Sequence, residues 1–139
     1  MVAQIFDGLI LIILTVAIHG LVLGWSLHRF NSRHAARAVR STVATVWLLS
    51  RLAVLVVLTH LIEILIWAVY FDWRGTIDTI ELAFYFSAVT YATIGYGDIV
   101  PPETWRVIAS MEGLTGILMC AWSGGYFFAI VSRLYRITI

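Results

Sequence analysis

The residues of this chain with the clearest chemical capacity form one short segment, in which two glycines flank an aromatic residue: Thr93, Ile94, Gly95, Tyr96, Gly97 and Asp98. Glycine permits alternation between left- and right-handed backbone dihedrals, which residues with a Cβ resist. This alternation points successive carbonyl groups the same way, so the segment can present a ladder of oxygens to a dehydrated cation. We expect the carbonyl oxygens of residues 93–96 to be the ligands of the cation, with the Thr93 hydroxyl at the inner end of the segment.

Two carboxylates lie inside long apolar runs, where an ionisable group is costly and usually has a partner or a function. Counted along helices, Glu63 and Glu112 lie about 12 Å inward from the ends of their runs. They are predicted either to be neighbours whose protonation modulates the protein, or to hydrogen-bond separately to backbone or hydroxyl groups such as those of Ser87 or Thr90. His60, one helical turn from Glu63, is an alternative partner.

The composition indicates a membrane protein. Hydrophobic residues make up 61% of the chain and charged residues 12%, which leaves too few polar side chains to cover a soluble protein of 139 residues. Three apolar runs reach the length of about 20 residues that a helix needs to cross a bilayer: 5–26, 50–71 and 104–132. His19 lies in the first run and is expected to be satisfied by an ordinary hydrogen bond.

A fourth apolar segment, 77–92, is too short to span. Asp78 and Glu81 have the spacing of a helix N-cap and its partner, and their negative charge suits the positive end of a helix dipole. The sequence therefore predicts a short re-entrant helix over 78–91 that leads directly into the glycine-containing segment.

The cations are all arginines, and most cluster between the first two runs or at the end of the chain: Arg29, Arg33, Arg37, Arg40, Arg133 and Arg136. The positive-inside bias places the loop and the C-terminus in the cytoplasm and the N-terminus outside, in a plasma (inner) membrane. Residues 35–46 are predicted to lie along the inner interface or to extend the second helix. This pattern argues against nucleic-acid binding, because a soluble basic surface is lacking.

The stretch from Tyr85 to Asp98 resembles the pore region of the potassium channel superfamily, in its minimal two-helix form, and the resemblance extends over about 50–134. It implies an all-α membrane fold in which four subunits surround one axis, and the single copy of the motif then requires a homotetramer. The domains expected are an extra helix in 1–27, a basic segment in 28–49 and a pore domain in 50–134. The pore domain would comprise an outer helix (50–71), a pore helix (78–91), a filter segment (93–98) and an inner helix (104–134).

The resemblance also implies roles for residues beside the K⁺ ligands. Four of them would support the filter segment or form its mouth: Tyr85, Phe86, Thr90 and Asp98. Tyr85 is expected to hydrogen-bond Asp98, and the Tyr96 ring to pack behind the filter segment. Ile94 replaces the commoner valine. Val89 stands where some bacterial channels carry a glutamate paired to the mouth aspartate, so the filter inactivation that depends on this pair is in doubt here.

Matching Trp105 and Arg106 to the start of the family's inner helix places Gly116 near the usual gating hinge, with Gly113 as the competitor. Helical spacing puts five residues on one face, which is the candidate pore lining and gate: Gly113, Ile117, Cys120, Gly124 and Phe128. Phe128 would form a hydrophobic constriction. The alternative is that the glycines only let helices approach closely.

The function expected is passive, K⁺-selective conduction across a lipid bilayer, with K⁺ as the permeant ion and no cofactor. The alternatives are a weakly selective cation channel and a non-conducting regulatory membrane subunit. Enzyme activity has no support, because no nucleophile–base pair or metal-ligand cluster stands out in soluble-facing sequence. Gating by a separate regulatory partner is left open, and the extra first helix is expected to pack at the periphery or against a neighbouring subunit.

Overall fold

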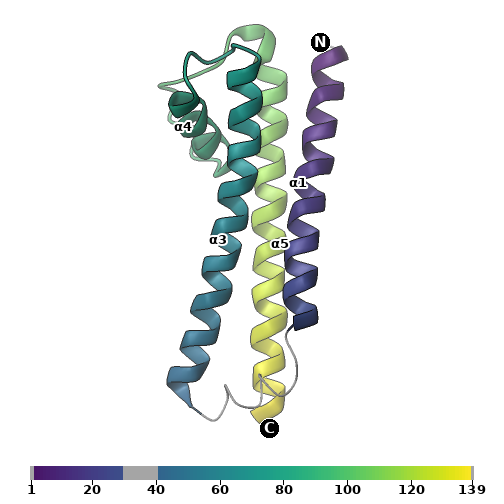
Figure 1. Cartoon of the computed structure of the whole chain (residues 1–139), viewed down its shortest axis with the longest axis vertical. Helices are drawn as coiled ribbons and strands as arrows, with labels where there is room; N and C mark the ends of the chain where they lie inside the picture. Colours follow the sequence, from purple (N-terminus) through teal and green to yellow (C-terminus); the bar gives the residue numbers. More distant parts are fainter. Residues whose placement is uncertain (1, 30–40, 139) are drawn as a thin grey trace.

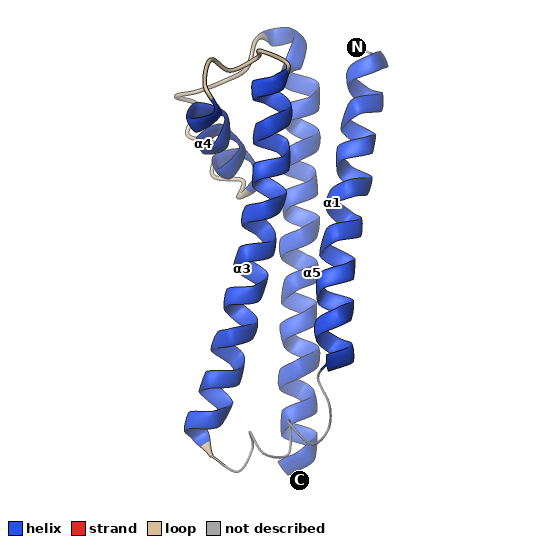
Figure 2. Cartoon of the chain, in the orientation of Figure 1, coloured by secondary structure: helices blue, strands red, loops and turns tan. Residues whose placement is uncertain are grey.

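The computed structural model describes residues 2–29 and 41–138, and every regular element in these ranges is a helix (Figures 1 and 2). The elements are α1 (Val2–Arg29), α3 (Thr42–Trp73), α4 (Ile80–Tyr91), a 3₁₀ turn (Glu103–Trp105) and α5 (Arg106–Thr138). Within the described residues, three helical stretches are long and apolar enough to cross a membrane: Ala3–Arg29, Thr42–Trp73 and Glu103–Leu134. The predicted all-α membrane architecture is confirmed at this level.

The three long helices run side by side, and the short helix α4 lies beside the upper part of α3 in Figure 1. Helix α4 packs on both α3 and α5, whereas α1 packs on α5 and α3. In Figure 1 the N-terminus lies at the α4 end of the bundle and the C-terminus at the opposite end. The chain thus has the three crossings that the sequence predicts.

Helix α3 is longer than the predicted span of 50–71, because it begins at Thr42. Residues 42–49 contain neither glycine nor proline, so nothing in the local sequence interrupts the helix before Ser41, whose backbone is extended. Of the two predictions for residues 35–46, extension of the second helix is therefore correct for 42–46. Residues 35–40 lie outside the described part of the chain.

The predicted cap of α4 is wrong by one residue. Thr79, rather than Asp78, is the N-cap: its backbone is extended (φ −141°, ψ 151°), and its Oγ1 accepts a hydrogen bond from the Leu82 amide at 3.3 Å. A threonine hydroxyl can satisfy one of the four unpaired amides at a helix start as a carboxylate does. The helix consequently begins at residue 80, with Glu81 in its first turn.

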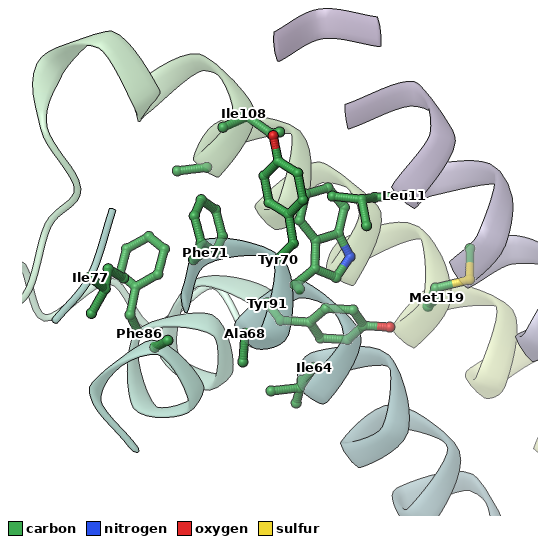
Figure 3. Packing of buried hydrophobic residues seen from close by; sticks show 13 residues of the cluster. Leu11, Ile64, Ala68, Tyr70, Phe71, Ile77, Phe86, Tyr91, Ile108 and Met119 are labelled. Carbon is green, nitrogen blue, oxygen red and sulfur yellow. The ribbon is translucent and has the colours of Figure 1, made fainter. Parts of the chain in front are cut away.

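An aromatic cluster fixes α4 against α3 (Figure 3). Trp67 and Phe71 on α3 are completely buried, and the Phe71 ring meets the Phe86 ring of α4 edge to face, with centroids 5.3 Å apart. Tyr91, at the end of α4, belongs to the same cluster and is 2% exposed. Edge-to-face rings prefer one relative orientation, so the cluster sets the direction in which α4 delivers the chain to residue 93.

The first helix is tied to the rest of its own chain at both ends. Near its start, Asp7 accepts a hydrogen bond from the Tyr70 hydroxyl at 2.9 Å. Near its end, the Ser26 hydroxyl lies 2.6 Å from that of Tyr126 on α5. Buried Leu23 packs with residues of α3 and α5 between these contacts. Helix α1 thus packs at the periphery of its own chain, which is one of its two predicted positions. Packing of α1 against a neighbouring subunit stays a prediction.

Candidate functional site

The backbone of the glycine-containing segment alternates in handedness. Thr93, Gly95 and Gly97 have positive φ angles of 59°, 61° and 77°, and the residues between them do not. This confirms the alternation predicted at the two glycines and adds Thr93 to it. A β-branched residue in the left-handed region costs about 1–3 kcal/mol, and such strain persists only where the surrounding structure enforces it.

Hydrogen bonds to the end of α4 enforce the first part of this conformation. The Thr93 amide donates to the Thr90 carbonyl at 3.0 Å, and the amides of Ile94 and Gly95 both donate to the Val89 carbonyl, at 2.9 and 3.3 Å. In the described part of the chain, no hydrogen bond is accepted by any carbonyl of residues 93–97. The amide donors of the segment therefore hold its shape, and a run of exposed carbonyl oxygens is left without partners in the single chain.

Tyr85 and Asp98 connect the two ends of this unit. The Tyr85 hydroxyl donates to Asp98 Oδ2 at 2.7 Å, as predicted, and Asp98 Oδ1 accepts from the Ile99 amide at 3.0 Å. The hydrogen bond from Tyr85 stabilises the charged carboxylate and so lowers the pKa of Asp98, while the same bond raises the pKa of Tyr85. This bond closes the loop that follows the last glycine.

A Tyr85→Phe substitution is expected to raise the pKa of Asp98, because it removes the principal cause of its depression. A depressed carboxyl pKa contributes stability above the pKa of the unfolded chain, and this contribution is lost as the pH falls through the folded value. The variant should therefore lose the native loop at a higher pH than the wild type during acid titration. Carboxyl-carbon NMR of Asp98 in nanodiscs measures the shift, and Tyr126→Phe, which removes a hydroxyl at the other end of the bundle, is the control. Equal Asp98 titrations in wild type and Tyr85→Phe would contradict the assignment.

Phe86 and Tyr85 both line the hollow beside the filter segment, but the two rings differ in burial. Phe86 is 6% exposed and packs into the α3 cluster through Phe71, whereas Tyr85 is 37% exposed. Neighbouring positions on a helix point about 100° apart, so one faces the core of the bundle and the other does not. Phe86 consequently anchors α4 on α3 beside this hollow, and the hydrogen bond to Asp98 belongs to Tyr85.

Gly116 lies where α5 meets the last turn of α4. A Cβ on Gly116 would stand 1.9 Å from the Tyr91 carbonyl oxygen and 2.7 Å from its carbonyl carbon. A Cβ on Gly113 would make only an ordinary contact, 3.5 Å from the Thr90 oxygen. Helix α5 runs without interruption through both positions. The structure thus supports close helix packing at Gly116, which is the alternative to a gating hinge.

A family model described as "Ion channel" matches residues 56–133, which is more than half of the chain and includes α4 and the segment after it. The chain belongs to the ion channel family. No curated protein and no solved structure matches it significantly. The matched part comprises most of α3, all of α4 and most of α5, so the two-helix, potassium-channel-type domain is present and α1 is an addition to it.

The predicted pore face of the channel is largely uncovered in the single chain. Ile117 is 54% and Phe128 75% exposed, and Cys120 and Gly124 are also exposed. Gly113 is half-buried and Gly116 is buried, so these two glycines lie against α4 instead. Four of the five residues of the predicted face, all except Gly113, are thus free to line a pore or to meet another subunit.

The two buried carboxylates of the channel have different surroundings. Glu63 contacts His19, His60 and Tyr91, whereas both oxygens of Glu112 lack a hydrogen-bond partner among the described residues. Glu112 interacts with the Ser87 hydroxyl of α4, although the two do not reach hydrogen-bond geometry. The described residues show no direct interaction between the carboxylates, although both act on the Tyr91 hydroxyl, and their being neighbours stays a prediction.

His60 is confirmed as a partner of Glu63, with Nδ1 3.3 Å from Oε2. The stronger partner is His19, whose Nδ1 lies 2.9 Å from Oε1 and which the sequence did not connect to this site. The only signal in the sequence was that an ionisable residue inside a span usually has a partner. Helical counting cannot identify that partner, because it does not say how α1 is displaced along α3.

Proposed function

We propose that the chain is one subunit of a homotetrameric channel that conducts K⁺ passively and selectively. The observation that carries this proposal is the run of unpartnered carbonyls at residues 93–97, on a backbone of alternating handedness. Four such runs around an axis provide the rings of oxygens that replace the hydration shell of K⁺ in known potassium-channel filters. The proposed ligands are the carbonyls of residues 93–96, with the Thr93 hydroxyl at the inner end.

The position of α4 supports this proposal electrostatically. The helix ends at Tyr91, immediately before the filter segment. A helix C-terminus carries a partial negative charge of about half an electron, so four α4 helices with their ends near one axis favour a cation there. The half-length helix and the filter segment thus act on the same ion.

The exposed surface of the chain supports assembly. The Tyr96 ring is 69% exposed in the single chain, so the packing predicted for it has to come from another subunit. A hollow of about 210 Å³ lies between α4 and the filter segment and is lined in part by Tyr85, Val89 and Gly97. One filter segment cannot surround an ion, and neighbouring subunits would supply both the missing rings and the missing packing.

The proposed orientation has the N-terminus outside and the C-terminus in the cytoplasm of a plasma membrane, on the basis of the arginine distribution. Asp98 then lies at the outer mouth of the pore. Ile117, Cys120, Gly124 and Phe128 would line the inner half, where the exposed Phe128 side chains of four subunits would form an apolar constriction.

Reconstitution of the purified channel into liposomes tests this function. Vesicles loaded with K⁺ should release it down its gradient, Ba²⁺ should block the release, and equivalent Na⁺-loaded vesicles should show little flux. Equal Na⁺ flux would contradict K⁺ selectivity and favour a weakly selective cation channel. A folded, reconstituted protein without flux of either ion would instead favour a regulatory subunit. Native mass spectrometry of the same sample tests the tetramer.

A further inference from the structure

A polar cluster outside the filter segment joins the four α-helices that the structure describes. His19 comes from α1, His60 and Glu63 from α3, Tyr91 from α4 and Ser123 from α5. His19 and Glu63 are completely buried, Ser123 is 5% exposed and the His60 side chain is 17% exposed. Five polar side chains therefore meet inside the bundle, in a place that conduction through the filter segment does not explain.

The two histidines present matching atoms to the same neighbours. Nδ1 of His19 lies 2.9 Å and Nδ1 of His60 lies 3.3 Å from the Glu63 carboxylate. On the other side of the rings, both Nε2 atoms lie near the Ser123 hydroxyl, at 3.2 Å for His19 and 3.1 Å for His60. Two rings from different helices are thus turned in the same sense, with both Nδ1 atoms facing one carboxylate.

This arrangement suits a metal ion with its supporting hydrogen bonds. A histidine that binds metal through one ring nitrogen usually donates the N–H of the other to an oxygen, which fixes its tautomer. The Ser123 oxygen has two lone pairs and can accept both Nε2–H groups. Both Nδ1 lone pairs then face the Glu63 carboxylate, and a cation between them removes the repulsion among these acceptors. If the cluster served only to give Glu63 a hydrogen-bond partner, one of the two histidine rings would be enough.

The distances also fit. In a tetrahedral site with bonds of about 2.0–2.2 Å, ligand atoms stand about 3.3 Å apart. His19, His60 and Glu63 each offer a ligand atom, and these atoms all lie within 4.8 Å of one another. His19 Nδ1 lies 2.9 Å from Glu63 Oε1 and His60 Nδ1 lies 3.3 Å from Oε2, so side-chain rotations that bring both nitrogens near one carboxylate oxygen would complete the geometry.

We propose that His19, His60 and Glu63 bind a divalent transition-metal ion, with Zn²⁺ the best match. Two imidazoles and one carboxylate are a common donor set for Zn²⁺, whereas Ca²⁺ and Mg²⁺ prefer oxygen ligands alone. The fourth position falls to a water molecule. The Tyr91 hydroxyl, which donates to Glu63 Oε2 and lies 3.2 Å from His60 Nδ1, orients the carboxylate.

The bound ion joins the extra helix to the conducting domain. It clamps α1 to α3 directly, contacts α5 through Ser123 and reaches the last residue of α4 through Tyr91. Tyr91 is two residues before Thr93, and its carbonyl faces Gly116. Figure 3 shows the Tyr91 ring among the buried residues of α3 and α5, with its hydroxyl turned toward the side where Met119 lies. Metal binding would therefore stiffen the base of the filter segment.

Metal analysis of the purified full-length protein tests the site. After equilibration with micromolar Zn²⁺ and removal of free ion, inductively coupled plasma mass spectrometry should find about one Zn²⁺ per chain. His19→Gln keeps a hydrogen-bonding group but removes a ligand, and it should weaken Zn²⁺ affinity at least about 100-fold, since loss of a supporting partner alone costs about 10- to 100-fold. His28→Gln is the matched control, because His28 lies exposed in the last turn of α1.

Two further measurements separate metal binding from a structural role. Ser123→Ala leaves all three ligands in place and should lower Zn²⁺ affinity about 10- to 100-fold. Co²⁺ added to the metal-free protein should give the visible d–d absorption of a tetrahedral site, and His19→Gln should abolish it. Wild-type protein that retains no more Zn²⁺ than His19→Gln, or that gives no Co²⁺ spectrum, would overturn the proposal. Because the Co²⁺ spectrum can be measured on wild type alone, a variant that fails to fold does not prevent a decision.

Discussion

A Gly95→Ala substitution is expected to abolish K⁺ flux through the reconstituted channel without dismantling the protein. Gly95 has a φ of +61°, and an added Cβ would meet no atom within 4 Å in its own chain. The effect therefore comes from the backbone: alanine in the left-handed region costs about 1–2 kcal/mol, or about 4–8 kcal/mol if the four subunits of the proposed tetramer change together. The conducting conformation should become about a thousandfold or more less populated, because relief of the strain turns a carbonyl out of the ladder.

Gly75→Ala is a closely matched control for this experiment. Gly75 has a φ of +62° and equally open surroundings, but it lies in the turn after α3. The same strain there should lower stability slightly and leave K⁺ flux within about twofold of wild type. Liposome flux and tetramer content measured on both variants give the comparison. Normal flux in Gly95→Ala, or an equal loss in both variants, would contradict the proposed role of the filter segment.

A Gly116→Ala substitution is expected to destabilise the packing of α4 on α5. The new Cβ would stand 1.9 Å from the Tyr91 oxygen and 2.9 Å from its Cα, and these are backbone atoms that cannot move aside as a flexible side chain can. The two helices would have to separate, at a cost of about 1–3 kcal/mol per chain or more. Thermal unfolding of the purified protein, followed by loss of the tetramer band, should show a clearly lower midpoint.

Gly125→Ala provides the comparison for Gly116→Ala, because it lies in the same helix and an added Cβ meets nothing within 4 Å in its chain. Alanine is the better helix former by about 1 kcal/mol, so this variant should be neutral or more stable. A hinge at Gly116 predicts a different result, namely altered open probability at unchanged stability. That result would contradict the packing role.

The predictions from sequence that succeeded depend on local chemistry. Glycines at 95 and 97 favour positive φ because they lack a Cβ, and the structure shows it at both. The hydrogen bond from Tyr85 to Asp98 also followed, on the strength of the family resemblance. The cap of α4 was missed by one residue because Asp78 and Thr79 are both good caps, and only the extended backbone at Thr79 decides between them.

Other features depended on how helices meet, which the sequence does not show. Glu63 and Glu112 were considered as neighbours from equal depth alone, but depth says nothing about the direction in which a side chain points around its helix. The structure turns Glu63 toward His19 and leaves Glu112 beside Ser87. Phe86 was predicted to brace the filter segment with Tyr85, and it does line the hollow beside that segment; its packing in the aromatic cluster of α3 is what the sequence did not predict.

By itself the sequence determined that this is a membrane protein with three helices long enough to span a bilayer, a half-length helix and a glycine-containing segment whose backbone can alternate in handedness. These features follow from hydropathy, helix length and glycine content, which are properties of continuous stretches of the sequence. Only the tertiary structure decided that Gly116 is a contact with Tyr91 and that His19, His60 and Glu63 share one site with Ser123. These contacts join residues as many as 104 positions apart, and their geometry depends on the relative rotation and displacement of whole helices, which no local pattern encodes.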